Sequence, residues 1–263
     1  MNVSYQSIRR VLLGAALLVS GVSAQDAVPS AKDLAAQLSG NIQDNSAVVR
    51  LKMEVSKPSG GGKTVLQLQV KSRRTKSATD LVYQVLWPKE RKGEAFLLRK
   101  SGGRAPTGSA FTLPDSLVAI SSSKMKDGIF GSDLAYEDLV ENFFAWENQA
   151  IVGTETIDRV ACQILESKPG KGDRATYPKV RSWIDTKRMV PLRVEKYADS
   201  GKLAKRIDTT RVAKDDTGRT VAASFSLQRP GQDSLTEIEG SNIKHDVTLA
   251  DSDFTPEALR NLK

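Results

Sequence analysis

The chain has 263 residues, a formal net charge of +8 at pH 7 and 39% hydrophobic residues, with one cysteine and one histidine. This cysteine and histidine content excludes an intrachain disulfide, a cysteine-based metal site and a histidine-rich metal site. The positive charge would suit nucleic acid, anionic lipid or simply a basic surface.

Residues 1–24 have the features of a secretory signal peptide. Arg9 and Arg10 precede an apolar run over residues 11–19, and small residues at 22 and 24 mark a cleavage site. A membrane anchor is the alternative, but this run is too short to cross a bilayer. We therefore expect cleavage after Ala24, a mature chain of residues 25–263 that forms one domain, and no nucleic-acid partner.

The mature chain should begin with a helix and continue with strands. Over residues 30–40, Ser30 is the expected N-cap and Gly40 the stop. In residues 47–55 apolar and charged residues alternate strictly, which is typical of a half-buried strand. Further strands are predicted over 63–71, 81–87 and 94–100. The glycine-rich residues 57–62 join two strands, so they do not form a phosphate loop, which needs a helix after it.

The strand pattern is interrupted over residues 105–147 and then resumes. Seven more strands are predicted over residues 150–157, 160–167, 179–186, 191–198, 203–213, 221–229 and 235–245. The turn at Asp158 and Arg159 lacks the glycine that tight hairpins favour. A last helix should begin at Thr255 and Pro256. About 10–11 strands with short turns predict a mainly β (α+β) fold, a curved antiparallel sheet that forms an unclosed half-barrel covered by helices.

The interrupted segment contains an acidic and aromatic stretch, GSDLAYEDLVENFFAWENQ, at residues 131–149. Its spacing predicts a helix over 133–144 with an apolar face, capped by Ser132 or Asp133. Asp133, Glu137 and Glu141 recur at intervals of four. Two acids on one exposed helix face cannot flank a substrate as glycosidase carboxylates do, so we expect a face that is solvated or paired with Lys and Arg.

The aromatic face is either an ordinary core contact or a lid over an apolar cavity. Cys162 and His245 could in principle form a catalytic pair, but Cys162 lies in a strand-like run and is expected to be a buried thiol. We therefore predict no catalytic residues, no enzyme activity, no metal site and no cofactor.

Several motifs resemble those of the LolA-like outer-membrane lipoprotein-sorting protein family. GSDLAYEDL resembles that family's GSD and YEDL signature, and residues 87–99 resemble its segment ending in G-x-x-F-L. Residues 150–169, 179–206 and 251–259 are similar to its hairpin, its W-x-D…P-L-R run and its F-T-P ending. The resemblance covers about residues 30–260.

This resemblance implies a periplasmic half-barrel that carries lipid or lipoprotein acyl chains without covalent chemistry. It also implies an inner-membrane transporter as a partner and transient contact with the membrane. The predicted lining of the apolar cavity and lid consists of apolar strand residues and lid aromatics: Leu51, Met53, Leu66, Leu68, Val85, Trp87, Phe96, Leu98, Phe130, Tyr136, Leu139, Phe143, Phe144, Trp146 and Phe225. The alternative function is a periplasmic sensor module that regulates a protein partner in the envelope.

Overall fold

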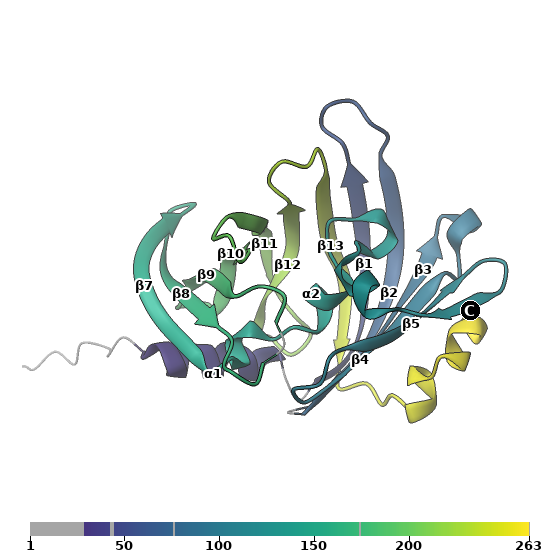
Figure 1. Ribbon diagram of the computed structural model, residues 1–263, viewed down its shortest axis with the longest axis horizontal. Helices are drawn as coiled ribbons and strands as arrows, with labels where there is room; N and C mark the ends of the chain where they lie inside the picture. Colours follow the sequence, from purple (N-terminus) through teal and green to yellow (C-terminus); the bar gives the residue numbers. More distant parts are fainter. Residues whose placement is uncertain (1–28, 43–44, 76, 174, 263) are drawn as a thin grey trace, which may run out of the picture.

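A computed structural model describes residues 29–42, 45–75, 77–173 and 175–262 of the chain. The predicted signal peptide, residues 1–24, lies outside the described residues. Within them, one antiparallel sheet dominates, and it curves so that short helices lie on its concave side (Figure 1).

The sheet has thirteen strands in the order β6-β5-β4-β3-β2-β1-β13-β12-β11-β10-β9-β8-β7. The strands are β1 (Asn45–Ser56), β2 (Thr64–Arg74), β3 (Ala78–Trp87), β4 (Ala95–Ser101), β5 (Thr107–Thr112), β6 (Ser116–Ala119), β7 (Asn148–Ile157), β8 (Val160–Lys168), β9 (Lys179–Asp185), β10 (Val190–Tyr197), β11 (Leu203–Lys214), β12 (Thr220–Gln228) and β13 (Leu235–His245). Strands β6 and β7 are the two edges, so the sheet is an open half-barrel, which confirms the predicted fold class.

Two strands lie where the sequence pattern predicted an interruption. Strands β5 and β6 form a hairpin inside residues 105–147, and they extend the sheet beyond β4. Both are short, and β6 has mostly exposed residues. A weak alternation of this kind does not stand out from a loop in the sequence, which explains why the predicted number of strands was too low.

The alternation of side chains assigns the two faces of the sheet. On β4, Phe96 and Leu98 face the concave side, where they join the largest buried cluster. Ala95 and Leu97 face the outer side, where they pack with Phe254 and other residues of the C-terminal segment. That segment contains the 3₁₀ helices η5 (Asp251–Phe254) and η6 (Glu257–Asn261).

Both predicted terminal helices are present, the second as a 3₁₀ helix with Pro256 as its N-cap instead of its first residue. The predicted stop at Gly40 is wrong, because the first helix continues to Ile42. Helix α1 (Ala31–Ile42) begins after Ser30, whose hydroxyl accepts the N–H of Asp33 at 3.2 Å. Its apolar stripe, Leu34, Ala35 and Leu38, packs on Leu165 of β8 and its neighbours. Near the C-terminus the Thr255 hydroxyl accepts the N–H of Ala258 at 3.2 Å at the start of η6.

The β7–β8 hairpin achieves a tight turn without glycine. Asp158 and Arg159 both have positive φ, 47° and 68°. Positive φ at both central residues is typical of the type I′ turn, whose twist suits a two-residue hairpin. Aspartate tolerates positive φ better than most residues. The glycine-rich residues 57–62 do connect β1 to β2, as the sequence predicted.

Candidate functional site: a lid on the concave face

The concave face is crossed by residues 120–146, which we call the lid. It contains four short helices, η2 (Ser122–Lys126), η3 (Ile129–Gly131), α2 (Tyr136–Val140) and η4 (Phe143–Ala145). The predicted continuous helix over 133–144 is therefore wrong: only five residues are α-helical. The lid folds back on itself at Gly128, where a Cβ would lie 1.7 Å from the carbonyl oxygen of Ser132. Only glycine permits this close approach of the backbone.

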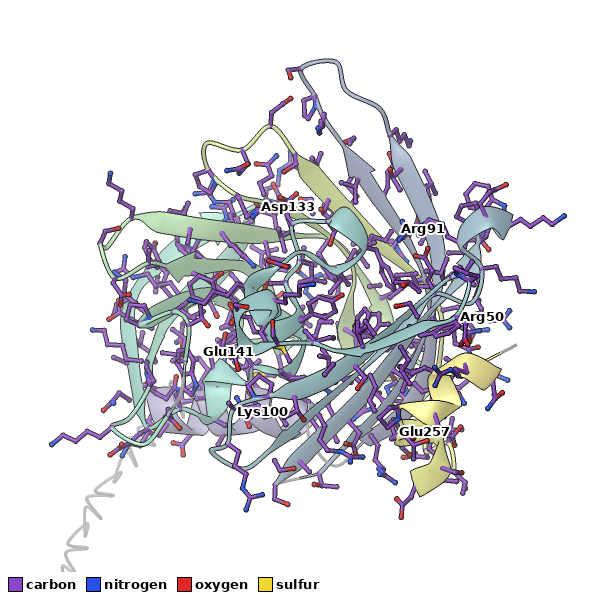
Figure 2. All side chains as sticks on the ribbon, turned by 45° about the vertical axis from the view of Figure 1, so that its right-hand side comes forward. Arg50, Arg91, Lys100, Asp133, Glu141 and Glu257 are labelled. Atoms are coloured by element: carbon purple, nitrogen blue, oxygen red, sulfur yellow. The ribbon has the colours of Figure 1, made fainter. Side chains whose placement is uncertain are left out.

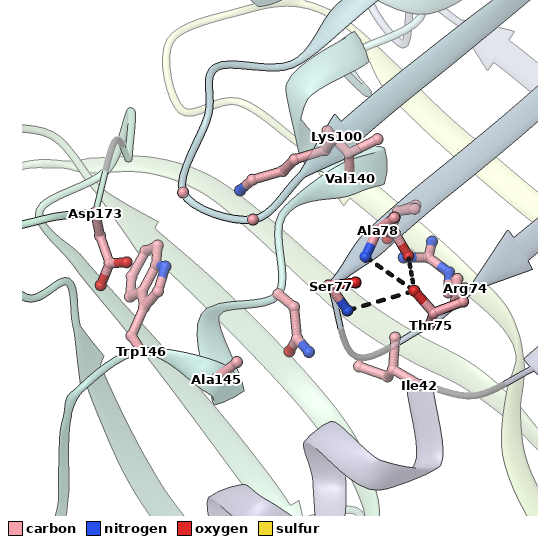
Figure 3. Close-up of a pocket in the computed structure, with 14 residues that line it drawn as sticks. Ile42, Arg74, Thr75, Ser77, Ala78, Lys100, Val140, Ala145, Trp146 and Asp173 are labelled. Carbon is pink, nitrogen blue, oxygen red and sulfur yellow. Dashed lines mark hydrogen bonds between the residues drawn. The ribbon is translucent and has the colours of Figure 1, made fainter.

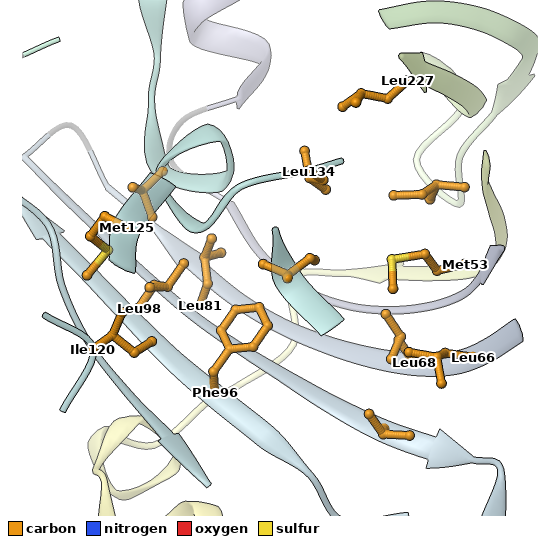
Figure 4. Packing of buried hydrophobic residues seen from close by; sticks show 14 residues of the cluster. Met53, Leu66, Leu68, Leu81, Phe96, Leu98, Ile120, Met125, Leu134 and Leu227 are labelled. Carbon is orange, nitrogen blue, oxygen red and sulfur yellow. The ribbon is translucent and has the colours of Figure 1, made fainter. Parts of the chain in front are cut away.

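Apolar side chains of the lid pack against the concave face of the half-barrel. Met125, Ile129, Leu134 and Val140 are buried against concave-face residues of β1–β4, β12 and β13, and we call this contact region the trough (Figure 4). Lid and sheet are in direct apolar contact at this point, and the buried members of the cluster are at most 8% exposed.

Aromatic rings organise the centre of the trough. Phe96 of β4 stacks on Tyr83 of β3, with ring centroids 4.8 Å apart and planes at 11°. Phe130 and Tyr136 of the lid approach the same ring at 5.3 and 4.9 Å. The Tyr136 ring stands at 82° to it, an edge-to-face geometry that is more favourable than a face-to-face one.

The structure brings eleven of the predicted lining residues together in the trough: Leu51, Met53, Leu66, Leu68, Val85, Phe96, Leu98, Phe130, Tyr136, Leu139 and Phe225. Phe143 and Phe144 instead pack near α1, and Trp146 packs with Tyr177 and Val194. The prediction that these residues bind a ligand stays a prediction.

Trp87 is placed differently from the other predicted residues. It ends β3 and is 49% exposed, and it belongs to none of the buried clusters. Trp87 is the last residue of its strand and is therefore not among the residues that form the trough. The prediction that it contacts a ligand stays a prediction.

The first polar anchor of the lid is Asp133. Its side chain is buried and accepts hydrogen bonds from Arg229 Nε at 2.9 Å, Ser234 Oγ at 2.6 Å and Thr236 Oγ1 at 3.0 Å. The Thr236 hydroxyl in turn accepts the N–H of Asp133 at 2.9 Å. The predicted capping role of Asp133 is wrong, because the helix begins after Ala135 and Asp133 ties the lid to β13 and to the turn between β12 and β13 (Figure 2).

The second anchor is a group of buried charges, which we call the clasp: Asp138 and Glu141 of the lid with Lys196 of β10 and Lys205 of β11. Lys196 Nζ lies 2.8 Å from Asp138 Oδ1 and 3.1 Å from Glu141 Oε2. The other oxygen of Asp138 accepts from Lys205. All four side chains are at most 8% exposed. The sequence predicted that acids of this stretch would be solvated or paired; they are paired, but they are also buried.

Asp138 and Lys196 of the clasp hold each other in their charged forms. Burial opposes ionisation of Asp138, but the adjacent Lys196 and Lys205 ammonium groups outweigh it and keep the pKa of Asp138 below its ordinary value. Burial likewise disfavours the Lys196 ammonium, while Asp138 and Glu141 raise its pKa above the ordinary lysine value. Near neutral pH Asp138 of the lid and Lys196 of the sheet therefore face each other as ions.

The third polar anchor is a hydrogen bond to the backbone of α2. Arg74 of β2 donates to the carbonyl oxygen of Leu139 at 3.0 Å. The arginine lies beside Tyr83, whose pKa burial raises to about 12 despite the nearby positive charge. The lid is therefore bonded to β2 on one side of the trough and to β10 and β11 on the other.

An open cleft of about 200 Å³ adjoins this end of the lid (Figure 3). It is lined by Val140 and Trp146 of the lid, by Arg74 and Lys100 of the sheet, and by Asp173 of the loop between β8 and β9. Its walls are half polar, unlike the trough. The cleft thus borders the lid at Val140 and Trp146.

The acidic and thiol candidates for catalysis are not assembled into a site. Glu137 accepts a hydrogen bond from the Thr176 hydroxyl at 2.5 Å, and burial raises its pKa. Cys162 is buried in β8, whereas His245 ends β13, and four strands separate β8 from β13 in the sheet. This distance rules out a Cys162–His245 pair.

One group of side chains in the described residues has the composition of a metal site. Potential ligand atoms of Asp215, Asp216 and His245 all lie within 4.8 Å of one another. The carboxylate of Asp215 already accepts hydrogen bonds from Thr217 and Arg219 of its own turn. The group therefore holds the β11–β12 turn against the end of β13 through hydrogen bonds.

No helix among the described residues is long and apolar enough to cross a membrane.

Solved structures share this architecture. A DUF1329 family protein from Desulfovibrio piger superposes with a TM-score of 0.79 at 23% identity, over 87% of this chain and 97% of that one. An outer-membrane lipoprotein-sorting protein domain from Vibrio parahaemolyticus gives 0.75 at 21%, over 86% and 97%. A LolA superfamily protein from Nitrosomonas europaea gives 0.69 at 18%, over 88% and 100%. The fold is thus the LolA-like half-barrel that the sequence motifs indicated.

The family assignment follows from the sequence. A family model described as that of an uncharacterized protein matches residues 78–261, which is more than half of the chain, and the protein belongs to that family. No curated protein matches the sequence.

Proposed function

We propose that the protein is a periplasmic carrier that binds an acyl chain, as a lipid or as part of a lipoprotein, in the trough and passes it on. The observation that supports this proposal most is the inserted lid: Phe130, Tyr136 and Leu139 occupy the centre of an apolar concave surface, and an acyl chain could replace them there. In this proposal an inner-membrane exporter delivers the cargo, and contact with the membrane is transient.

The energetics of the trough suit reversible binding. Each buried CH₂ group of a ligand gains about 0.8 kcal/mol, so a chain of about sixteen carbons gains on the order of 10 kcal/mol without a specific polar contact. Removing the lid costs the burial of its own apolar side chains and the three polar anchors. The apolar side chains of the lid and the acyl chain would bury the same concave surface. The free energy gained from the cargo therefore offsets the free energy lost when the lid is displaced, and cargo and lid compete for one surface.

The lipoprotein-sorting name of the Vibrio structure agrees with this proposal, as does the signal peptide predicted over residues 1–24. Neither the trough nor the clasp contains a nucleophile paired with a base. The proposed activity is therefore binding and transfer without covalent chemistry.

Native mass spectrometry of protein purified from the periplasm without detergent tests the proposal directly. A stoichiometric adduct, identified after solvent extraction, is the expected result. Uptake of a fluorescent fatty acid by protein stripped of that adduct should follow. A protein without adduct that also takes up no fatty acid would overturn the carrier proposal and favour regulation of a protein partner.

Two adjacent residues of β4 give a matched pair of variants for the uptake measurement. Leu98 faces the trough and Leu97 faces the outer side, and both are buried. Leu98→Gln should strongly reduce uptake of the probe, whereas Leu97→Gln should destabilise the fold to a similar degree but leave uptake unchanged. Equal uptake by both variants would place the acyl chain elsewhere.

A further inference from the structure

The two lysines of the clasp form an unusual pair on the sheet. Lys196 of β10 and Lys205 of β11 are directly opposite each other in the strand register, and both side chains face the concave side. Like charges at opposite positions of an antiparallel pair repel and destabilise the sheet. Both residues are also buried, at 2% and 5% exposure, where charge is costly. Apolar residues would serve the sheet better, so the pair requires another explanation.

Only lid carboxylates neutralise these lysines among the described residues. Asp138 bridges them with its two oxygens, and Glu141 adds a contact to Lys196. The rings of Tyr177 and Phe143 lie 5.2 and 5.7 Å from Lys196 Nζ. The lid thus places an anion between two cations in a pocket walled by aromatic rings.

The lysine pair adjoins the trough. Lys205 and Ile207 point to the same face of β11, two residues apart, which corresponds to about 7 Å. Ile207 packs against the trough cluster and also against the cluster around Tyr177. When the lid leaves, two uncompensated positive charges therefore remain beside a continuous apolar surface.

We propose that Lys196 and Lys205 form the binding site for the acidic head group of an anionic amphiphile, and that Asp138 and Glu141 of the closed lid occupy this site in place of that group. The lid then takes the place of the whole amphiphile. Its carboxylates occupy the head-group site on the lysines, and its apolar side chains occupy the acyl-chain site in the trough. The inference rests on the proposed carrier function and narrows its cargo to chains with a carboxylate or phosphate head group.

The test compares three probes that share one sixteen-carbon chain: hexadecanoate, hexadecyl phosphate and the neutral hexadecanol. Their affinities are measured by displacement of a fluorescent fatty acid from the delipidated protein. The wild-type protein should bind both anions more tightly than the alcohol. A preference for one of the two anions would distinguish a carboxylate cargo from a phosphate cargo.

Two variants act on the lysine site in opposite directions. Asp138→Asn with Glu141→Gln frees the lysines, and it should tighten anion binding at least about tenfold, because the head group then forms charge-assisted hydrogen bonds without displacing the lid carboxylates. The alcohol should gain much less. Adding Lys196→Met and Lys205→Met removes the site without leaving a buried charge, and the anions should then bind no better than the alcohol.

The outcomes separate the two proposals. If the fourfold variant keeps the wild-type preference for anions, or if the wild-type protein binds all three probes equally, the head-group site is refuted while the carrier function stands. If no variant binds any probe, although circular dichroism shows the native sheet, both proposals are refuted.

Discussion

The lid is attached to the half-barrel in two regions of opposite character. In the trough, apolar and aromatic side chains from the lid meet β1–β4, β12 and β13, and the contact is spread over many residues. In the clasp, four charged side chains carry the contact to β10 and β11. Apolar contacts depend on area and can be exchanged for a ligand in small steps, whereas buried charges tolerate no missing partner.

The largest effect should come from breaking the clasp on one side only. Lys196→Met leaves Asp138 and Glu141 buried with one lysine fewer, and we expect a loss of about 3–5 kcal/mol in the free energy of unfolding. Denaturant titration followed by circular dichroism measures this loss. Arg260→Ala, which breaks an exposed pair with Asp115, is the control, with a change below about 0.5 kcal/mol.

The fourfold variant sharpens this result. With Lys196 and Lys205 replaced by methionine and the two acids by their amides, no buried charge remains in the clasp, and most of the lost stability should return. A single Lys196→Met variant as stable as the wild type would mean that water reaches the clasp and that the two regions do not differ as described.

A smaller effect is expected in the trough. Leu139→Ala removes a half-buried lid side chain, and the unfolding free energy should fall by about 2 kcal/mol, the lower end for leucine in a core. Leu117→Ala is the matched control, since this leucine is half-buried against the outer cluster. Both should destabilise similarly, but only Leu139→Ala should increase the uptake of a fluorescent fatty acid. Equal uptake by both variants would contradict competition between lid and ligand.

The smallest effect should come from lowering the pH, which protonates Asp138 and weakens the clasp. The pKa of Asp138 is lower in the folded protein than its ordinary value of 3.8, so its contribution to stability is complete above that value and is lost as the pH falls through the lower, folded-state pKa. In urea titrations between pH 6 and pH 2.5, the stability of the Asp138→Asn variant should decline less steeply than that of the wild type. Parallel declines would show that Asp138 is not held ionised by the lysines.

The sequence by itself determined most of the sheet and the apolar half of the site. Strict alternation in residues such as Leu51 and Met53 specifies both a strand and the residues that share its buried face, because side chains in a strand alternate with a period of two. The same rule puts Leu66 and Leu68 on one face of their strand, and Phe96 and Leu98 on one face of theirs, but only the structure shows that both faces line the trough. Local signals also sufficed at the helix ends, where Ser30 and Thr255 cap within three residues of themselves.

Only the tertiary structure decided the polar half of the site. Asp138 finds its partners 58 and 67 residues away, and Asp133 finds Arg229 at a separation of 96. An acid that will be buried against a distant lysine has the same local pattern as one in water, so the stretch 131–141 suggested a longer helix with an accessible acidic face. The partners of a buried charge depend on which strands the fold brings beside the lid. Local sequence periodicity therefore cannot predict these ion pairs.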